Sequence, residues 1–374
     1  MKICYFTHIS NLTGSNQSLL DILSGIRKFN VEPVVVLCKK GSIEGELNKR
    51  NIKYIIFPYK TDIKSKNPIK NIIKTITNYI CLHLIKYYLI KNKIEIVHNN
   101  SYVCRIGMEA ALSAKIPFVC HNRELFQESF NMDILNEKKS MVLLSKADAV
   151  IEISEAVYEK YSKMVPDANY YILHDGIDVN KYYQIHEPIL YSSQVNILLA
   201  GNLLSNKGQM QAVQALELLE KKGYHNINLT LAGGGRQEEY GKQLFAYIEK
   251  QHINNITYED FCDLTEFRRK SDIVLVCSKY EGLGRVTIEG QLSGCLVIGA
   301  ATSGTKEIIA DGETGLLYEY GNIDDLADKI VYAIQNPEKM NQIAQNGQEM
   351  AKNNFDLDSY CGKLFEIYKK ILPQ

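Results

Sequence analysis

The sequence of 374 residues has no long apolar run, no closely spaced cysteine pairs and no net charge. No run approaches the roughly 18 to 20 apolar residues of a membrane span. The first eight residues, MKICYFTH, turn polar too soon for a signal peptide, so we expect neither feature. The nine cysteines never occur in C-x-x-C spacing, which disfavours a disulfide framework or a zinc site and fits a reducing, cytoplasmic compartment.

The absence of net charge conceals an uneven distribution. Residues 1–184 hold 25 Lys and Arg against 18 Asp and Glu, and residues 185–374 hold 18 against 25. A basic first half could face an anionic partner, or the two halves could simply attract each other. Nucleic acid is a disfavoured partner, because aromatic platforms do not alternate with the lysines.

Apolar, β-branched runs recur through both halves, with helical patterns between them. Most of these runs are continuous rather than alternating, as in strands that are buried on both faces. They are KICYFT, PVVVLC, YIIF, IEIVH, PFVC and AVIEIS in the first half, and VNILLAG, INLTLAG, NITY, DIVLVC and LVIGA in the second. Strand and helix therefore alternate twice over, which predicts an α/β protein with two Rossmann-like, doubly wound domains.

The predicted domains span residues 1–185 and 190–355, and residues 356–374 form a terminal helix. The segment 182–194 lacks periodicity and is the best linker candidate. In such domains ligands bind beyond the carboxyl ends of the strands, so a two-domain version has two such rims facing a central cleft.

One loop stands out after the predicted strand DIVLV. It reads SKYEGLGRVTIEG from Ser278 to Gly290 and places two glutamates around a pair of glycines. Gly282 and Gly284 allow close approach of a ligand to the backbone, and the helix that follows offers its N-terminus to an anion. Glu289 in that helix could hold a ribose diol, and Glu281 would then lie beside a sugar beyond the diphosphate. The alternative is a glycine turn with two solvated glutamates.

The surrounding motifs resemble those of the retaining nucleotide-sugar glycosyltransferases of family four, which have the GT-B architecture. The resemblance covers about 170–355 strongly and the first half only in outline. It implies that the first domain binds the acceptor, that the second binds the nucleotide-sugar donor, and that the terminal helix 356–374 crosses back onto the first domain. The alternative for this helix is packing on the second domain alone. The resemblance rests on the glutamate loop, on AGNLLSNKG, LAGGG and ILHDGID, and on SGCLVIGAATSGTKEIIADGETGLLY. Matching positions in and after the glutamate loop are Ser278, Glu281, Gly282, Gly284, Glu289, Gly294, Val297, Gly304, Glu307, Gly312 and Gly315.

The resemblance implies a role for each matching residue. Lys207 would contact the donor diphosphate, whose charge grows as it departs. Glu281 would orient the donor sugar, and His121 would lie near that sugar; these three are the expected catalytic residues. Glu307 is either a further polar contact or a helix cap. The expected donor-binding residues are Gly14, Ser15, Gly201, Asn202, Lys207, Gly233, Phe261, Gly282, Leu283, Gly284, Arg285 and Glu289.

The sequence departs from the family pattern in two places. Asn202 stands where the family usually has an arginine beside the diphosphate, and we hypothesise that Arg285 supplies charge instead. The stretch TYEDFCDLTEF (257–267) resembles the one whose backbone contacts the base. Asp260 replaces its usual glycine, so the identity of the base is not predicted.

The first half offers fewer matches. Gly14 and Ser15 follow the first strand, where the family has a glycine loop facing the diphosphate and the acceptor. His98 and His121 follow other strands, and a structural role is the alternative for each. Ser154 could border the cleft.

A basic segment interrupts the first half. Residues 60–93 hold eight lysines and one acid, with isoleucines at positions 69, 72, 73, 76 and 80 at helical spacing. Such a helix could rest on an anionic membrane beside a lipid-linked acceptor. The alternative is a helix whose isoleucines face the core and whose lysines are solvated.

The resemblance therefore implies a glycosyltransferase that moves a sugar, with retention, from a nucleotide-diphosphate sugar to a saccharide or lipid-linked acceptor. Surface polysaccharide synthesis is the expected setting, in the cytoplasm or against the inner face of the membrane. The donor is a co-substrate, and we expect no cofactor and no metal. The alternatives are a degenerate homologue that binds another glycosyltransferase, and a GT-B epimerase or phosphorylase, whose patterns do not occur here.

Overall fold

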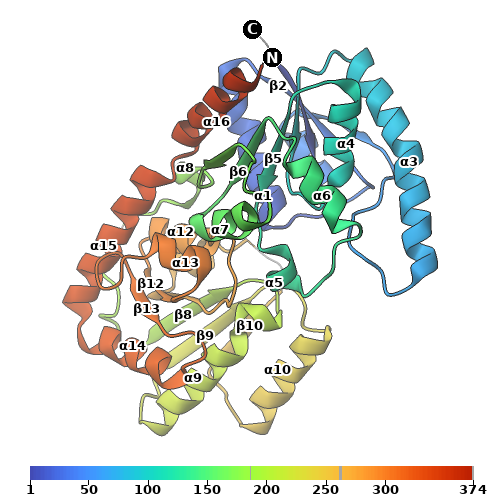
Figure 1. The fold of residues 1–374 in the computed structure, drawn as a ribbon. Helices are drawn as coiled ribbons and strands as arrows, with labels where there is room; N and C mark the ends of the chain where they lie inside the picture. The colour runs from blue at the N-terminus through green and yellow to red at the C-terminus, as the bar shows by residue number, and fades with distance from the viewer. Residues whose placement is uncertain (186, 261–262, 373–374) are drawn as a thin grey trace. The chain divides into compact units, whose positions relative to one another are not determined.

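The computed structural model describes residues 1–185, 187–260 and 263–372. The chain divides into two compact units, Met1–Asp178 with Phe355–Gln374, and Val179–Asn354 (Figure 1). The second unit thus begins just before the segment that the sequence marked as a linker.

A sheet of parallel strands forms the centre of the first unit, in the order β3-β2-β1-β4-β5-β6-β7. Its strands are β1 (Lys2–Phe6), β2 (Glu32–Leu37), β3 (Lys53–Ile56), β4 (Ile96–Asn99), β5 (Phe118–Asn122), β6 (Ala149–Glu152) and β7 (Tyr170–Ile172). Its helices are α1 (Gly14–Gly25), α2 (Ile43–Lys49), α3 (Pro68–Lys91), α4 (Arg105–Ala114), α5 (Phe126–Phe130), α6 (Glu137–Leu144), α7 (Glu155–Met164) and α16 (Leu357–Ile371).

The second unit repeats this plan with a parallel sheet in the order β10-β9-β8-β11-β12-β13. Its strands are β8 (Val195–Ala200), β9 (Ile227–Ala232), β10 (Ile256–Glu259), β11 (Ile273–Val276), β12 (Leu296–Ala300) and β13 (Leu316–Tyr318). Its helices are α8 (Val179–Tyr182), α9 (Gln209–Lys221), α10 (Glu239–Lys250), α11 (Thr265–Arg269), α12 (Arg285–Leu292), α13 (Ser303–Ile308), α14 (Ile323–Gln335) and α15 (Pro337–Asn354).

The strands of the second sheet are buried on both faces, as their continuous apolar sequence predicts. In β8, Ile197 and Leu199 pack into one apolar cluster, and Leu198 and Ala200 pack into another on the opposite face. The predicted fold class of two Rossmann-like α/β units is confirmed. The strands β7 and β13 escaped the sequence analysis because each is only three residues long, too short to show a pattern.

The terminal helix α16 packs in the first unit. Its side chains Leu364 and Tyr368 are buried in the same apolar cluster as Leu19 and Leu20 of α1. Asp356 caps the helix by accepting a hydrogen bond from the backbone N–H of Ser359 at 2.8 Å, a role that aspartate commonly has at this position. The chain therefore returns to the first unit after completing the second.

Helix α3 differs from the core-facing alternative that the sequence allowed. The five isoleucines between Ile69 and Ile80 are each more than half exposed, and the buried face consists of Cys81, Ile85 and Leu89. The core-facing interpretation of these isoleucines is therefore wrong. None of the helices in the described part of the chain is long and apolar enough to cross a membrane.

Candidate functional site

The carboxyl ends of β8 and β11 form the natural binding position in the second unit. These strands are neighbours, and the chain continues from them toward opposite edges of the sheet. At such a switch point the two following loops separate and leave a crevice for a ligand. The loop after β8 carries Lys207, and the loop after β11 carries Glu281.

Close backbone packing joins these two loops. The backbone N–H of Lys279 donates to the carbonyl of Asn206 at 2.8 Å. Gly208 has φ +71°, and a Cβ at this position would lie 2.0 Å from the carbonyl oxygen of Cys277. Only glycine fits this approach without displacement of backbone, so the loop holding Lys207 is seated directly on the end of β11.

The structure brings the predicted cation and the predicted sugar-orienting carboxylate together. Lys207 Nζ lies 2.6 Å from Glu281 Oε1, and the two side chains are 26% and 15% exposed. The sequence analysis placed Lys207 on the diphosphate and Glu281 on the sugar, without expecting that they touch. A diphosphate that binds Lys207 must therefore replace this carboxylate or share the lysine with it.

Glycine turns after β8 and β9 expose backbone beside this ion pair. Gly233 has φ +148°, and a Cβ there would lie 2.3 Å from the carbonyl oxygen of Gly201. Gly201 also has positive φ, and the atom nearest to a Cβ there is Cδ of Lys207, at 3.9 Å. Asn202 is exposed in the same turn, and its carbonyl accepts a hydrogen bond from the Gln209 side chain at 3.0 Å. Phe261 lies outside the described residues.

The glutamate loop ends as the sequence predicts, with a helix that begins after a glycine. Gly284 has φ +99° and precedes α12. The loop rests on the start of α13, where the N–H of Gly304 donates to the carbonyl of Glu281 at 3.2 Å. Leu283 is buried, and its backbone packs closely against Gly304, whereas Gly282 is partly exposed.

Glu289 is held by two arginines, one of which the sequence analysis missed. Arg268 Nη2 donates to Glu289 Oε2, and Arg285 Nη2 lies 3.5 Å from Glu289 Oε1. Arg268 is 5% exposed and stacks over the Tyr182 ring at 5.3 Å. The hypothesis that Arg285 supplies charge to a diphosphate stays a prediction, because in the structure its partner is Glu289. A buried arginine in the sequence FRRK is indistinguishable from its exposed neighbours.

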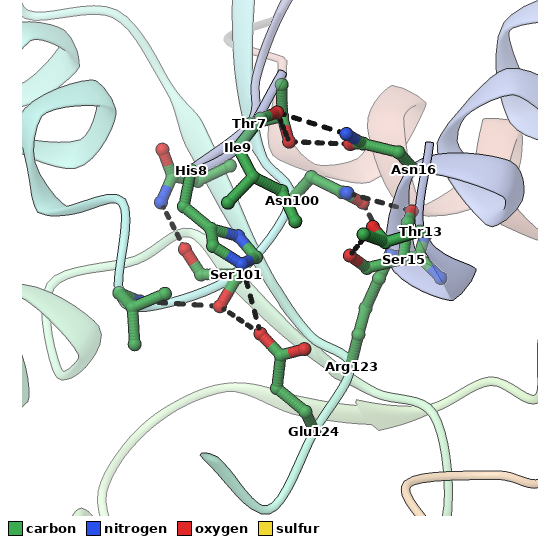
Figure 2. Close-up of polar contacts among 12 residues, drawn as sticks. Thr7, His8, Ile9, Thr13, Ser15, Asn16, Asn100, Ser101, Arg123 and Glu124 are labelled. Carbon is green, nitrogen blue, oxygen red and sulfur yellow. Dashed lines mark hydrogen bonds and ion pairs between the residues drawn. The ribbon is translucent and has the colours of Figure 1, made fainter. Parts of the chain in front are cut away.

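The first unit has its own switch point, between β1 and β4, and polar side chains gather there (Figure 2). Gly14 begins α1, and a Cβ on it would meet no atom within 4 Å. Ser15 accepts a hydrogen bond at its carbonyl from Asn100 Nδ2 at 3.2 Å, and its hydroxyl lies 3.2 Å from that of Thr13. Gly14 and Ser15 therefore lie at the edge that the sequence predicts.

A buried arginine connects this edge to the interior. Arg123 Nε donates to Asn100 Oδ1, and Arg123 Nη1 bonds Asp175 Oδ2 at 2.6 Å. Its Nη2 lies 3.2 Å from Nδ1 of His121. Burial lowers the pKa of His121 well below its usual value, and the charge of Arg123 lowers that pKa further. His121 is thus a fully buried ring, which does not fit the predicted contact with the donor sugar. It can act on the edge of the site only through Arg123.

A second polar group at the same edge was not predicted. Ser101 Oγ donates to Glu124 Oε1 at 3.0 Å, and His8 Nε2 lies 3.8 Å from that oxygen. Burial lowers the pKa of His8, and the charge of Glu124 partly opposes this shift. These residues follow the ends of β1, β4 and β5, which was the one available signal in the sequence. Together they can bind hydroxyl groups.

The other two residues considered at strand ends have structural partners. His98 is fully buried, and its Nδ1 lies 2.7 Å from the Tyr368 hydroxyl of α16. Ser154 caps α7 by accepting from the N–H of Val157 at 3.2 Å. Within the described ranges, no three His, Cys, Asp or Glu side chains gather closely enough to hold a metal ion.

Comparison with known proteins adds to this geometry. Residues 185–350 match the family model of the group 1 glycosyl transferases, which is nearly the whole second unit and under half of the chain. An uncharacterized glycosyltransferase of Methanocaldococcus jannaschii is 28% identical over 192 residues, which are 51% of this chain and 53% of that protein. The chain thus spans about half the length of that relative. The capsular polysaccharide biosynthesis glycosyltransferase CapM of Staphylococcus aureus is 23% identical over 314 residues, covering 83% of this chain and 77% of CapM.

The whole chain also resembles a solved structure. The crystal structure of Anabaena HepE in complex with UDP superposes with a TM-score of 0.83 at 20% identity, covering 99% of this chain and 100% of HepE. HepE has also been solved with UDP-glucose. At this identity the likeness shows the fold, which is that of the GT-B glycosyltransferases.

Proposed function

Because residues 185–350 match the group 1 glycosyl transferases and the chain, with its two Rossmann-like units, has the GT-B fold, we propose that this chain is a retaining glycosyltransferase. It moves a sugar from a UDP- or GDP-sugar to a saccharide or lipid-linked acceptor. The observation that carries the proposal is the pairing of Lys207 with Glu281 at the switch point of the second sheet. One fixed cation and one fixed carboxylate there suit a diphosphate joined to a sugar.

The second unit binds the donor in this proposal. Lys207 contacts the diphosphate, and the turns at Gly201 and Gly233 present their backbone to it. Glu289 of α12, oriented by Arg268, accepts the ribose hydroxyls. A uridine nucleotide is the first candidate, because HepE has been solved with UDP and UDP-glucose.

The chemistry proposed is transfer on one face of the sugar. The bond from the anomeric carbon to the diphosphate breaks while a bond to the acceptor oxygen forms on the same face. The acceptor proton passes to a leaving phosphate oxygen, so charges balance without a protein nucleophile. Lys207 stabilises the charge that develops on the leaving group, and Glu281 orients the sugar and favours positive charge at its ring. Lys207 supplies the cation in this scheme, so we propose that the reaction needs no metal.

The first unit binds the acceptor in this proposal. Glu124 and His8 offer partners for hydroxyl groups where the chain leaves β5 and β1, and the space next to Gly14 at the start of α1 is open. His121 positions Arg123, which in turn fixes Asn100 and the loop at Ser15.

For the setting, we propose surface polysaccharide synthesis in the cytoplasm, against the inner face of the membrane. The support is the similarity to CapM, which is a capsular polysaccharide biosynthesis glycosyltransferase. A lipid-linked acceptor would place the enzyme at that surface.

Two observations favour a second function. Asn202 stands where a second cation on the diphosphate is expected, and Glu281 already neutralises Lys207. A homologue that has lost turnover and binds another glycosyltransferase would also fit these two features.

The test is the melting temperature of the protein with UDP, GDP and their sugars. A ligand that binds only the folded state stabilises it by about 2.7 kcal/mol at a hundred times its Kd. We expect one nucleotide to stabilise the wild type and to stabilise Glu289→Gln much less. Glu349→Gln, an exposed carboxylate of the same unit, is the matched control. Equal shifts in wild type and Glu289→Gln would remove the ribose assignment, and no shift at millimolar ligand would favour the non-catalytic homologue.

A further inference from the structure

Helix α3 has two apolar faces, and only one of them packs on the protein. The inner face consists of Cys81, Ile85 and Leu89, each at most 2% exposed. Along the outer face, nine large apolar side chains between Ile69 and Ile90 are each more than half exposed. A helix that is apolar all round is normally buried, so the outer face of α3 lacks the cover that its sequence suits.

The surroundings of this outer face are basic. The 24 residues of α3 contain no acid, and residues 60–93 contain eight lysines. Lys66, Lys70, Lys91 and Lys93 are exposed at the two ends of the helix. The single acid of the segment, Asp62, is buried and paired with Arg105 at 2.7 Å. Outside the segment, Asp133 lies 3.9 Å from Lys64. Within residues 60–93, an apolar stripe with lysines and no exposed carboxylate is the pattern of a helix that lies on anionic lipid.

The helix is also firmly fixed to its unit. Asn78 bonds both the N–H and the carbonyl of Lys60, and Asn71 does the same for Ser65. Figure 1 shows α3 along the outer side of α4, against which it packs. The outer face is therefore formed before any partner arrives, and its length is about 36 Å at 1.5 Å per residue.

We propose that the outer face of α3 docks the protein on an anionic lipid bilayer, with the helix lying in the plane of the interface. The inner face stays packed on the protein, so the helix lies on the membrane and does not cross it. A second copy of the chain is a poor occupant, because two such faces would bring their lysines together without acids to pair them. The docking itself does not depend on the enzymatic activity; only its purpose, access to a lipid-linked acceptor, rests on the proposed function.

The sequence contains no tryptophan, which allows a direct test. In Tyr87→Trp, at a position 65% exposed on the outer face, the single indole reports the polarity around α3. We expect its emission to shift to the blue with vesicles of phosphatidylcholine and phosphatidylglycerol, and to return as salt is raised. No shift, or an equal shift with phosphatidylcholine alone, overturns the proposal. A shift that grows with protein concentration in the absence of vesicles shows self-association and also overturns it.

Sedimentation with the same vesicles gives a second measurement. Ile76→Glu with Ile80→Glu places two acids on the exposed face, and we expect at least tenfold weaker binding. Ile185→Glu with Tyr191→Glu makes the same change at exposed apolar residues of the second unit and should bind like wild type. Equal losses in both double variants would show a general charge effect and refute the assignment to α3. Nucleotide binding, measured in parallel, should not change in either variant, so a failure of the proposed function is seen separately.

Discussion

The pairing of Lys207 with Glu281 predicts opposite effects of Glu281→Gln on nucleotide binding and on turnover. In the structure Lys207 Nζ lies 2.6 Å from Glu281 Oε1, so a diphosphate must compete with this carboxylate for the cation. A partly exposed ion pair contributes about 0 to 1 kcal/mol. Its removal should therefore tighten UDP or GDP binding by up to about fivefold, while turnover falls because the sugar loses its orienting carboxylate.

Lys207→Ala should act in the opposite direction on binding. A hydrogen bond to a charged group contributes about 1.5 to 3 kcal/mol, so nucleotide affinity should fall roughly 10- to 150-fold. The loss should be larger in the Glu281→Gln background, where the lysine no longer gives up a partner. Calorimetric titration of the four proteins gives this double-mutant cycle. Lys222→Ala, which breaks the exposed pair with Asp328 in the same unit, is the control.

Two results would refute this reasoning. If Glu281→Gln weakens nucleotide binding as much as Lys207→Ala does, Glu281 contacts the nucleotide and does not compete with it. If Lys207→Ala binds nucleotide like wild type, the diphosphate lies elsewhere.

Three further predictions concern stability, measured by chemical unfolding. Gly208→Ala should lower the free energy of unfolding by at least about 2 kcal/mol, because the new Cβ would overlap a backbone oxygen of the neighbouring loop. Gly223 also has positive φ but has open space around it, so Gly223→Ala should lower this free energy by only about 1 to 2 kcal/mol. Arg268→Met should lower the free energy of unfolding by about 3 kcal/mol, because the buried Glu289 keeps only one distant partner. Most of this stability should return when Glu289→Met is added. If it does not return, the Arg268–Glu289 pair is not the cause of the loss. Burial and the charge of Arg123 hold the pKa of His98 well below its usual value. From about pH 6 down to about pH 5, only the unfolded chain therefore gains a proton at this residue, and the free energy of unfolding falls. The wild type should lose about 1.4 kcal/mol of unfolding free energy per pH unit more than His98→Phe, and parallel pH profiles of the two proteins would contradict this.

The sequence predicts the building plan well because buried parallel strands leave a clear signal. Runs such as VNILLA and IVLV are apolar on both faces, and each strand of four or more residues in the structure has such a run. The site was predicted as separate residues on separate loops. That Lys207 meets Glu281 depends on the order of strands in the sheet, which places β8 beside β11. The paired residues Ile197 and Ile273 of these strands are 76 positions apart in the sequence.

Burial explains what the sequence left undecided. Arg268 has the same local pattern as Arg269, and only the packing against Tyr182 and Glu289 distinguishes the two. In α3 the set around Ile76 and the set around Ile85 both recur at helical spacing, so periodicity alone cannot say which set faces the core. The fold assigns the core to the second set.

The most direct test of the proposed activity is the configuration of the sugar first released or transferred from a UDP- or GDP-sugar, followed by proton NMR. We predict that the wild type yields the anomer of the donor, and that Lys207→Ala and Glu281→Gln yield far less. The opposite anomer would contradict the retaining mechanism. Release no faster than in the absence of protein, despite nucleotide binding, would contradict the assignment as an enzyme.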